Sequence, residues 1–267
     1  MTAGDSMPRA AFETIETVRK ADWANVRTIV QKTYGDATRM RESARLRSHN
    51  QSPSKGISHL GPACVNTNGL GCGDPTALAA LQPGETVLDL GSGPGLDCFV
   101  AALCVGQGGR VVGIDLTPEM IRLARHNAAE AGVRTVSFLL GEIERLPLQG
   151  EVFDVVMSNC VINLCPDKNR VLTEVYRVLR RGGRLAFSDI VGLGPLPREI
   201  ADDLVLYAGC VAGVVTAEEM SAVLHDAGFD SIRIVLREKS HQLLSSWAPG
   251  RGLERFVAAA DIMAIKS

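Results

Sequence analysis

Three of the seven cysteines stand in short stretches whose residue types suit a binding site. Cys160 follows Asn159 directly, after an apolar stretch that predicts a buried strand. Cys72 lies in the glycine-rich stretch GLGCGDP, and Cys210 lies among small residues in YAGCVAG. Thiolates are the ligands that soft metal and metalloid centres prefer. A single cysteine is more often a small buried core residue, so each thiol taken alone leaves both interpretations open.

A glycine-rich turn, VLDLGSGPG, joins a predicted strand to a predicted helix. Its informative residues are Asp89, Gly91, Gly93 and Gly95. Glycines at such a turn let the backbone approach a ligand closely. Asp115 ends the next predicted strand, where a carboxylate can accept hydrogen bonds from ribose hydroxyls. The spacing G-x-G-x-G differs from the dinucleotide fingerprint, and the whole arrangement predicts a nucleoside ligand of another kind.

From residue 75 onward, predicted strands alternate with predicted helices. The strands are expected at 86–93, 110–116, 135–142, 152–159 and 184–190, and the helices at 96–106, 117–132 and 166–183. Two helical pieces follow within 197–228, and two closing strands at 231–236 and 256–265, one of them antiparallel. This alternation predicts an α/β fold with a doubly wound, mostly parallel sheet. The carboxyl edge of such a sheet is where ligands lie, which places Asn159 and Cys160 there.

Composition limits the classes of partner. The chain has 267 residues with a net charge of −2, which gives no reason to expect nucleic acid or an anionic membrane as a partner. No apolar run approaches the roughly 18 residues of a membrane-spanning helix, and the first residues lack the apolar core of a signal peptide. We therefore expect a cytoplasmic protein whose seven cysteines are reduced.

From about residue 70 to 190 the chain resembles the class I S-adenosylmethionine-dependent methyltransferases. The resemblance rests on the glycine turn, on Asp115, and on the stretches GEIERLPL, FDVVMSN and EVYRVLRRGGRLAFSD. It implies a Rossmann-like sheet of seven strands, with N-terminal helices and a helical insertion on the substrate side. The cofactor contacts it implies are Tyr34, Asp89, Gly91, Ser92, Gly93, Gly95, Asp115, Leu116, Met120, Glu142, Ile143 and Asn159.

Within that superfamily the chain resembles the arsenite methyltransferases. The specific matches are GLGCGDPTA, SNCVINL with the following PDK, and YAGCVAG, and together they cover roughly residues 69–229. The resemblance implies that Cys72, Cys160 and Cys210 bind trivalent arsenic. It also implies a thiol reductant, glutathione or thioredoxin, as co-substrate, and we expect a monomer. No cysteine occurs in residues 1–63, which departs from the family pattern, and Cys64 is a further candidate ligand.

We divide the chain into an N-terminal helical cap and loop at 1–68, a cofactor-binding core at 69–192, and arsenic-side helices with closing strands at 193–267. Cys98 and Cys104 are expected to pack in a helix core, and Cys165 to stand outside the chemistry. Two alternatives to arsenic methylation remain. One is a methyltransferase of a small organic acceptor, and the other is a non-catalytic protein that binds arsenic or another metal through thiols. A structural zinc site is disfavoured because no close cysteine pair of the C-x-x-C kind occurs.

Overall fold

A computed structural model describes Thr28, Gln31, Lys32, Gly35 and residues 72–267, apart from 204, 205, 208, 239, 248 and 249 and the side chains of 242, 243 and 246. The predictions for Tyr34, for Cys64 and for most of the N-terminal cap lie outside these residues. Within the described part of the chain, no helix combines the length and the apolar composition needed to cross a bilayer.

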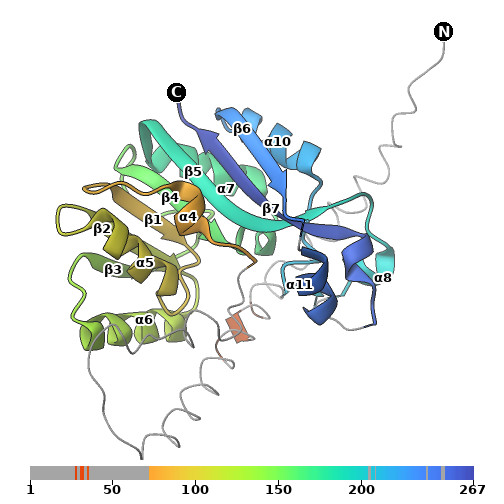
Figure 1. The fold of residues 1–267 in the computed structure, drawn as a ribbon, viewed down its shortest axis with the longest axis horizontal. Coiled ribbons are helices and arrows are strands. Elements are labelled where there is room, and N and C mark those ends of the chain that lie inside the picture. The colour runs from red at the N-terminus through yellow and green to blue at the C-terminus, as the bar shows by residue number, and fades with distance from the viewer. Residues whose placement is uncertain are drawn as a thin grey trace, which may run out of the picture.

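Seven strands form one sheet in the order β3-β2-β1-β4-β5-β7-β6 (Figure 1). The strands are β1 (Thr86–Leu90), β2 (Arg110–Asp115), β3 (Val136–Leu140), β4 (Phe153–Asn159), β5 (Leu179–Gly192), β6 (Asp230–Leu236) and β7 (Val257–Ile265). The first five pair in parallel, whereas β7 is antiparallel to both β5 and β6. The predicted α/β class, the seven strands and the antiparallel closing strand are confirmed.

Helices cover both faces of the sheet (Figure 1). On one face lie α4 (Pro75–Ala79), α5 (Leu96–Val105) and α6 (Pro118–Ala131), and on the other lie α7 (Lys168–Val178) and α10 (Ala217–Asp226). Successive residues of β1 pack against opposite faces of the sheet. Val87 belongs to the core that contains Phe99 of α5, and Leu88 belongs to the core that contains Leu172 of α7. This explains why the central strands read as continuous apolar runs.

The structure differs from the sequence-based prediction mainly at one helix end and in one additional helix. The helix expected at 166–183 ends at Val178, because Leu179 already pairs with Phe153 of β4. One helix, α11 (Ser240–Trp247), was not predicted. It lies beside the first residues of β7, with the short α8 (Arg198–Ala201) nearby (Figure 1). Two single 3-10 turns, η2 (Ile162–Leu164) and η3 (Leu253–Arg255), complete the described elements.

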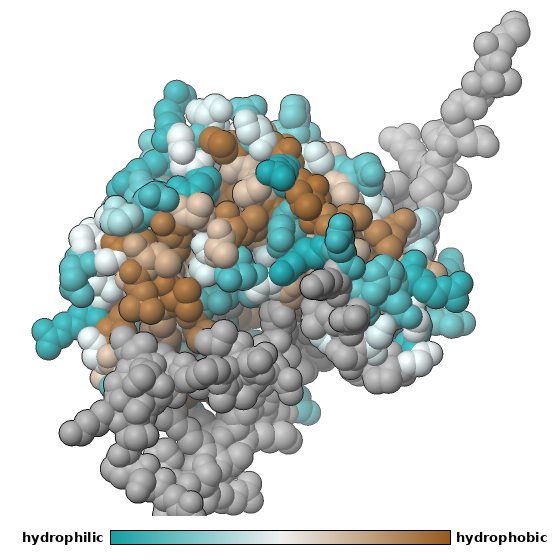
Figure 2. Space-filling model, in the orientation of Figure 1, coloured by the Kyte–Doolittle hydropathy of each residue, from teal (hydrophilic) through white to brown (hydrophobic). Residues whose placement is uncertain are grey.

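Large apolar side chains are exposed at both ends of the sheet, including Leu140 and Leu236 at the carboxyl ends of β3 and β6. Figure 2 shows them over α5 and along β7, where Leu103 is 65% and Ile265 is 41% exposed. A hollow of about 200 Å³ between α4 and β7 is lined by Leu78 and Met263 among others. The hollow is lined by Arg184 and Leu185 near the amino end of the paired part of β5, whereas the glycine turn and Cys160 follow the carboxyl ends of β1 and β4.

Candidate active site

The glycine turn between β1 and α5 is held against the end of β2. The backbone N–H groups of Gly91 and Ser92 donate to the carbonyl of Ile114, at 2.8 and 2.9 Å. Gly91, Gly93 and Gly95 all have φ in the left-handed region, where a side chain is disfavoured. A Cβ on Gly91 would collide with the side chain of Val161, whereas a Cβ on Gly93 would point into open space. The turn therefore presents bare backbone to that open space.

Asp115 ties the end of β2 to this turn. Its Oδ2 accepts from the Gly93 N–H at 2.9 Å and its Oδ1 accepts from the Thr117 N–H at 2.8 Å. Burial raises the pKa of Asp115, and these donors oppose the rise. Asp115 also accepts hydrogen bonds from the Thr117 side chain and the Leu116 N–H. A carboxylate at this position is the kind of group that binds ribose hydroxyls. The side chain of Gln31 donates to the neighbouring Leu116 carbonyl at 3.3 Å, which places one N-terminal residue beside this region.

Beneath the turn lie two more carboxyl groups. Asp89 is 2% exposed, its pKa is raised well above the usual value by burial, and the thiol of Cys98 donates to it at 3.2 Å. Burial also raises the pKa of Asp97, which accepts from the Asn159 side-chain amide at 3.2 Å. Asp97 was not predicted, although its place directly after the glycine turn, in GLDCF, was an available signal.

The remaining predicted cofactor residues follow the ends of β2 and β3. Met120 is buried in the first turn of α6, after Thr117 at the N-cap position and Pro118 at the first helical position. Glu142 and Ile143 come just after β3, where Glu142 forms an isolated backbone bridge with Arg145 and Ile143 is buried. The structure thus brings these residues to the same edge of the sheet as the glycine turn.

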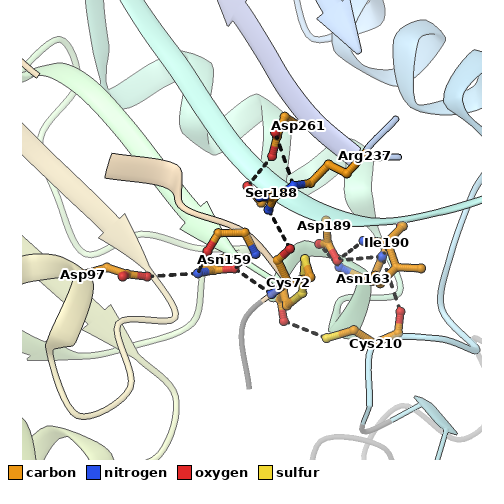
Figure 3. Close-up of a disulfide and its surroundings, with 12 residues drawn as sticks. Cys72, Asp97, Asn159, Asn163, Ser188, Asp189, Ile190, Cys210, Arg237 and Asp261 are labelled. Atoms are coloured by element: carbon orange, nitrogen blue, oxygen red, sulfur yellow. Dashed lines mark hydrogen bonds and ion pairs between the residues drawn. A yellow bond between two sulfur atoms is a disulfide. The ribbon is translucent and has the colours of Figure 1, made fainter. Parts of the chain in front are cut away.

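All three candidate cysteines lie just beyond β4, and each is at most 5% exposed. The sulfurs of Cys72 and Cys160 lie close together, whereas the sulfur of Cys210 does not belong to the group of mutually close ligand atoms that these two form with Asp189. Cys72 and Cys160 are joined in a disulfide, with their Cα atoms 6.0 Å apart. The thiol of Cys210 donates to the Cys160 carbonyl at 2.7 Å (Figure 3). The expectation that all seven cysteines are reduced is wrong for this structure. The reason is that the fold places Cys72 and Cys160, which are 88 residues apart in the sequence, close enough for their sulfurs to bond.

Two of the three cysteines adopt unusual backbone conformations. Cys160 has a φ of 53° and Cys210 has a φ of 64°, in the left-handed region that non-glycine residues rarely occupy. Such strain persists only where the surroundings enforce it, and it concentrates at functional sites. At Cys160 the enforcing contact is the hydrogen bond from its N–H to the Ser188 carbonyl at 2.8 Å, which extends the pairing of β4 with β5 by one residue.

Asn159 connects the cysteine cluster to the glycine turn. Its Oδ1 accepts from the N–H groups of Cys72 and Gly73, at 3.1 and 3.3 Å, and its amide nitrogen donates to the Gly73 carbonyl at 3.1 Å. The same amide nitrogen donates to Asp97. One side chain at the end of β4 therefore holds the Cys72 loop and contacts the region below the glycine turn.

The Cys72 loop is also held from the closing strands. Nη1 of Arg237, just after β6, donates to the Cys72 carbonyl at 2.8 Å, and its Nε lies 3.7 Å from Asp261 of β7. Asp261 in turn accepts from the Ser188 hydroxyl at 2.7 Å (Figure 3). Gly73 has no room for a side chain, because a Cβ there would overlap Ser188. None of these three supporting residues was predicted from the sequence.

The other described cysteines lie outside the cluster. Cys98 is fully buried in the core of α5, as predicted. Cys104 is exposed, so its predicted core position is wrong, because it lies outside the buried face of the helix that includes Cys98, Ala102 and Val105. Cys165 is buried in the main core, and burial raises its pKa well above the usual value.

The fold and site define the class of protein. Residues 81–228 match a family model described as a methyltransferase domain, and the chain belongs to this family. Among known relatives it is 50% identical over 198 residues to the arsenite methyltransferase of Halobacterium salinarum, covering 74% of this chain and 51% of that protein. It is 41% identical over 158 residues to the human arsenite methyltransferase, covering 56% and 42% of the two chains. The chain thus spans about half the length of these relatives.

A solved structure agrees with these relatives. The crystal structure of an arsenic(III) S-adenosylmethionine methyltransferase from Chlamydomonas reinhardtii superposes with a TM-score of 0.63 at 33% identity, over 77% of this chain and 70% of that one. More distant methyltransferase structures, such as phosphoethanolamine N-methyltransferase 2 of Haemonchus contortus at 18% identity, share the fold only.

Proposed function

We propose that this protein transfers a methyl group from S-adenosylmethionine to trivalent arsenic bound by Cys72, Cys160 and Cys210. The observation that carries the proposal is the meeting of three buried cysteines at the sheet edge that also holds the glycine turn, with Asn159 hydrogen-bonded toward both. The relatives named as arsenite methyltransferases support the same substrate.

The glycine turn fits the proposed cofactor. Gly93 faces open space, the buried Ser92 hydroxyl has no hydrogen-bond partner among the described residues, and Asp115 lies at the end of β2 beside the turn. Gly91, Gly93 and Asn159 would hold the methionine end, and Asp115 with Leu116 the nucleoside. Bound there, S-adenosylmethionine supplies a methyl group on a positively charged sulfur. The contribution of the chain is to place the nucleophile, and positioning of this kind is worth up to roughly 7–11 kcal/mol.

Arsenic binding needs no strong base in the site. Burial, with a smaller contribution from the negative charge of Asp189, raises the pKa of the Cys210 thiol well above its usual value, so the free cysteine is protonated at neutral pH. Three thiols that exchange with the three hydroxyl groups of arsenite release three waters, so each proton leaves with an oxygen. The product is a neutral arsenic trithiolate whose lone pair is the nucleophile for the methyl group.

The disulfide requires a reductant before arsenic binds. Two electrons and two protons convert the Cys72–Cys160 disulfide to two thiols, while two thiols of the reductant, from one thioredoxin or two glutathione molecules, are oxidised to a disulfide. Glutathione or thioredoxin would serve, and both belong to the cytoplasm, where we propose that the protein acts as a monomer. Cys64 remains a proposed additional ligand that delivers arsenic to Cys72.

A direct assay tests the proposal. Purified protein is incubated with S-adenosylmethionine, arsenite and a thiol reductant, and arsenic species are separated by chromatography with elemental detection. We expect methylated arsenic that disappears in Cys160→Ser and Cys210→Ser, with either arsenite or a methylated trivalent arsenical as substrate. Arsenic binding without methylation would favour a sequestering protein. Loss of both, with cofactor binding retained, would favour an organic acceptor.

A further inference from the structure

Asp189 is a fourth reactive group in the cysteine cluster. It lies in β5 near its carboxyl end and is 1% exposed. A carboxylate oxygen of Asp189 and the sulfurs of Cys72 and Cys160 all lie within 4.8 Å of one another. Figure 3 shows it beside the disulfide, on the side of β5 that also faces Asn163. Among the described residues, no other group of three His, Cys, Asp or Glu side chains brings its ligand atoms this close together.

The carboxylate is fixed in orientation by three N–H donors. Its Oδ1 accepts from the Asn163 side-chain amide and from the Ile190 N–H, both at 2.8 Å, and its Oδ2 accepts from the Asn163 N–H at 3.1 Å. Donors of this kind favour the ionised form. Burial opposes them and raises the pKa of Asp189, while the three N–H donors and the nearby Lys168 ammonium favour the charged carboxylate.

Methyl transfer moves a positive charge toward this carboxylate. The arsenic lone pair forms the new arsenic–carbon bond while the carbon–sulfur bond of the donor breaks, and the bonding pair of that bond returns to sulfur. The sulfonium becomes a neutral thioether, and the neutral arsenic trithiolate becomes a methylarsonium cation. We propose that Asp189 stabilises the positive charge that develops on arsenic in this step, an inference that rests on the proposed function.

The same charge is expected to leave arsenic binding unaffected. The trithiolate complex is neutral, so a neighbouring carboxylate neither attracts nor repels it before transfer begins. Fixed charges aimed at a developing charge accelerate a reaction without strengthening ground-state binding. Loss of the Asp189 charge should therefore lower the rate of transfer and leave the affinity for arsenite unchanged. A residue that only shaped the site would lower both.

The test compares two variants that remove the charge, Asp189→Asn and Asp189→Ser, with a matched control, Asp154→Asn. Asp154 also accepts a backbone N–H, from Thr86 at 2.8 Å, but at the opposite edge of the sheet. Arsenite affinity and the number of arsenic–sulfur bonds are measured on reduced, cofactor-free protein by titration and X-ray absorption. Single-turnover methyl transfer is then measured on arsenic-loaded protein with saturating S-adenosylmethionine.

We expect at least one Asp189 variant to retain arsenite affinity and three sulfur ligands while its transfer rate falls about 10- to 100-fold. The Asp154→Asn rate should stay within about twofold of the wild type, as for a surface carboxylate remote from the reaction. An unchanged rate in the arsenic-loaded variants overturns the inference. Failure of both variants to fold or to bind arsenite also overturns it, because Asp189 is then required for shape. If the wild type itself does not methylate arsenic, the proposed function fails instead.

Discussion

Arg237 is predicted to hold the Cys72 loop in its arsenic-binding position, and removing it should weaken arsenite binding. Its Nη1 donates to the Cys72 carbonyl at 2.8 Å, and its Nε lies 3.7 Å from Asp261. A hydrogen bond from a charged donor contributes about 1.5–3 kcal/mol, and an exposed ion pair contributes about 0–1 kcal/mol. The Arg237 side chain is 39% exposed, so we take the lower end of the combined range, about 1.5 kcal/mol.

That loss corresponds to roughly tenfold weaker binding of arsenite by the reduced protein, because Cys72 is then held less firmly beside the other two cysteines. The assay is a titration of Arg237→Ala with arsenite, with Arg233→Ala as the control. Arg233 is an exposed arginine on β6, so its removal changes net charge equally. An affinity of Arg237→Ala within about twofold of the Arg233→Ala value would refute the proposed role of this hydrogen bond.

Three further predictions concern the cofactor, the glycine turn and pH. Asp115→Ala should weaken S-adenosylmethionine binding about 10- to 100-fold by calorimetry, since it removes a charged acceptor, while arsenite affinity stays constant; unchanged cofactor affinity would exclude the ribose role. Gly91→Ala should lower the free energy of unfolding by about 2–4 kcal/mol in urea, because φ is positive and a Cβ meets Val161. Gly84→Ala, with positive φ but open space, should lose only about 1 kcal/mol, and equal losses would refute the steric reason. Asp189, whose pKa is raised to about 6, holds a proton in the folded protein that the unfolded chain releases, so its contribution is favourable at low pH and is lost as pH rises from about 4 to 6. Between pH 4 and 7 the wild type should therefore lose about 3 kcal/mol of stability relative to Asp189→Asn, and a pH-independent difference would contradict the raised pKa.

Much of the fold could be predicted because its signals are local. The apolar strands, the glycines at the turn and the Pro118 and Gly132 boundaries of α6 each reflect backbone chemistry within a few residues. The alternation of strands and helices then restricts the topology to a parallel sheet. The carboxyl edge follows from that topology, which is why Asn159 and Cys160 were placed there correctly.

The supporting residues of the site could not be predicted, since their roles depend on contacts between distant segments. In the sequence, Asp189 is a polar residue near the end of a predicted strand. None of its sequence neighbours indicates that two cysteine sulfurs lie within 4.8 Å of its carboxylate. Arg237 contacts Cys72 across 165 residues of sequence. The disulfide has the same origin, because only the paired strands bring the Cys72 loop beside Cys160.

Cys104 shows a different limit of predicting burial from the sequence. Its position in an apolar helix suggested a core residue, yet the structure exposes it. The helix α5 is apolar on nearly all sides, so hydrophobic spacing does not distinguish its buried face from its exposed one. A helix such as α7 has a clear polar face, so its sequence pattern separates buried from exposed residues, although its predicted end was misplaced.

X-ray absorption of the reduced, arsenite-loaded protein measures directly whether one arsenic atom is bound by the sulfurs of Cys72, Cys160 and Cys210. We expect three arsenic–sulfur bonds in the wild type and in the exposed-cysteine control Cys104→Ser. Cys210→Ser should show two sulfur ligands and one oxygen ligand. Three sulfur ligands retained in Cys210→Ser, or none in the wild type, would contradict the account.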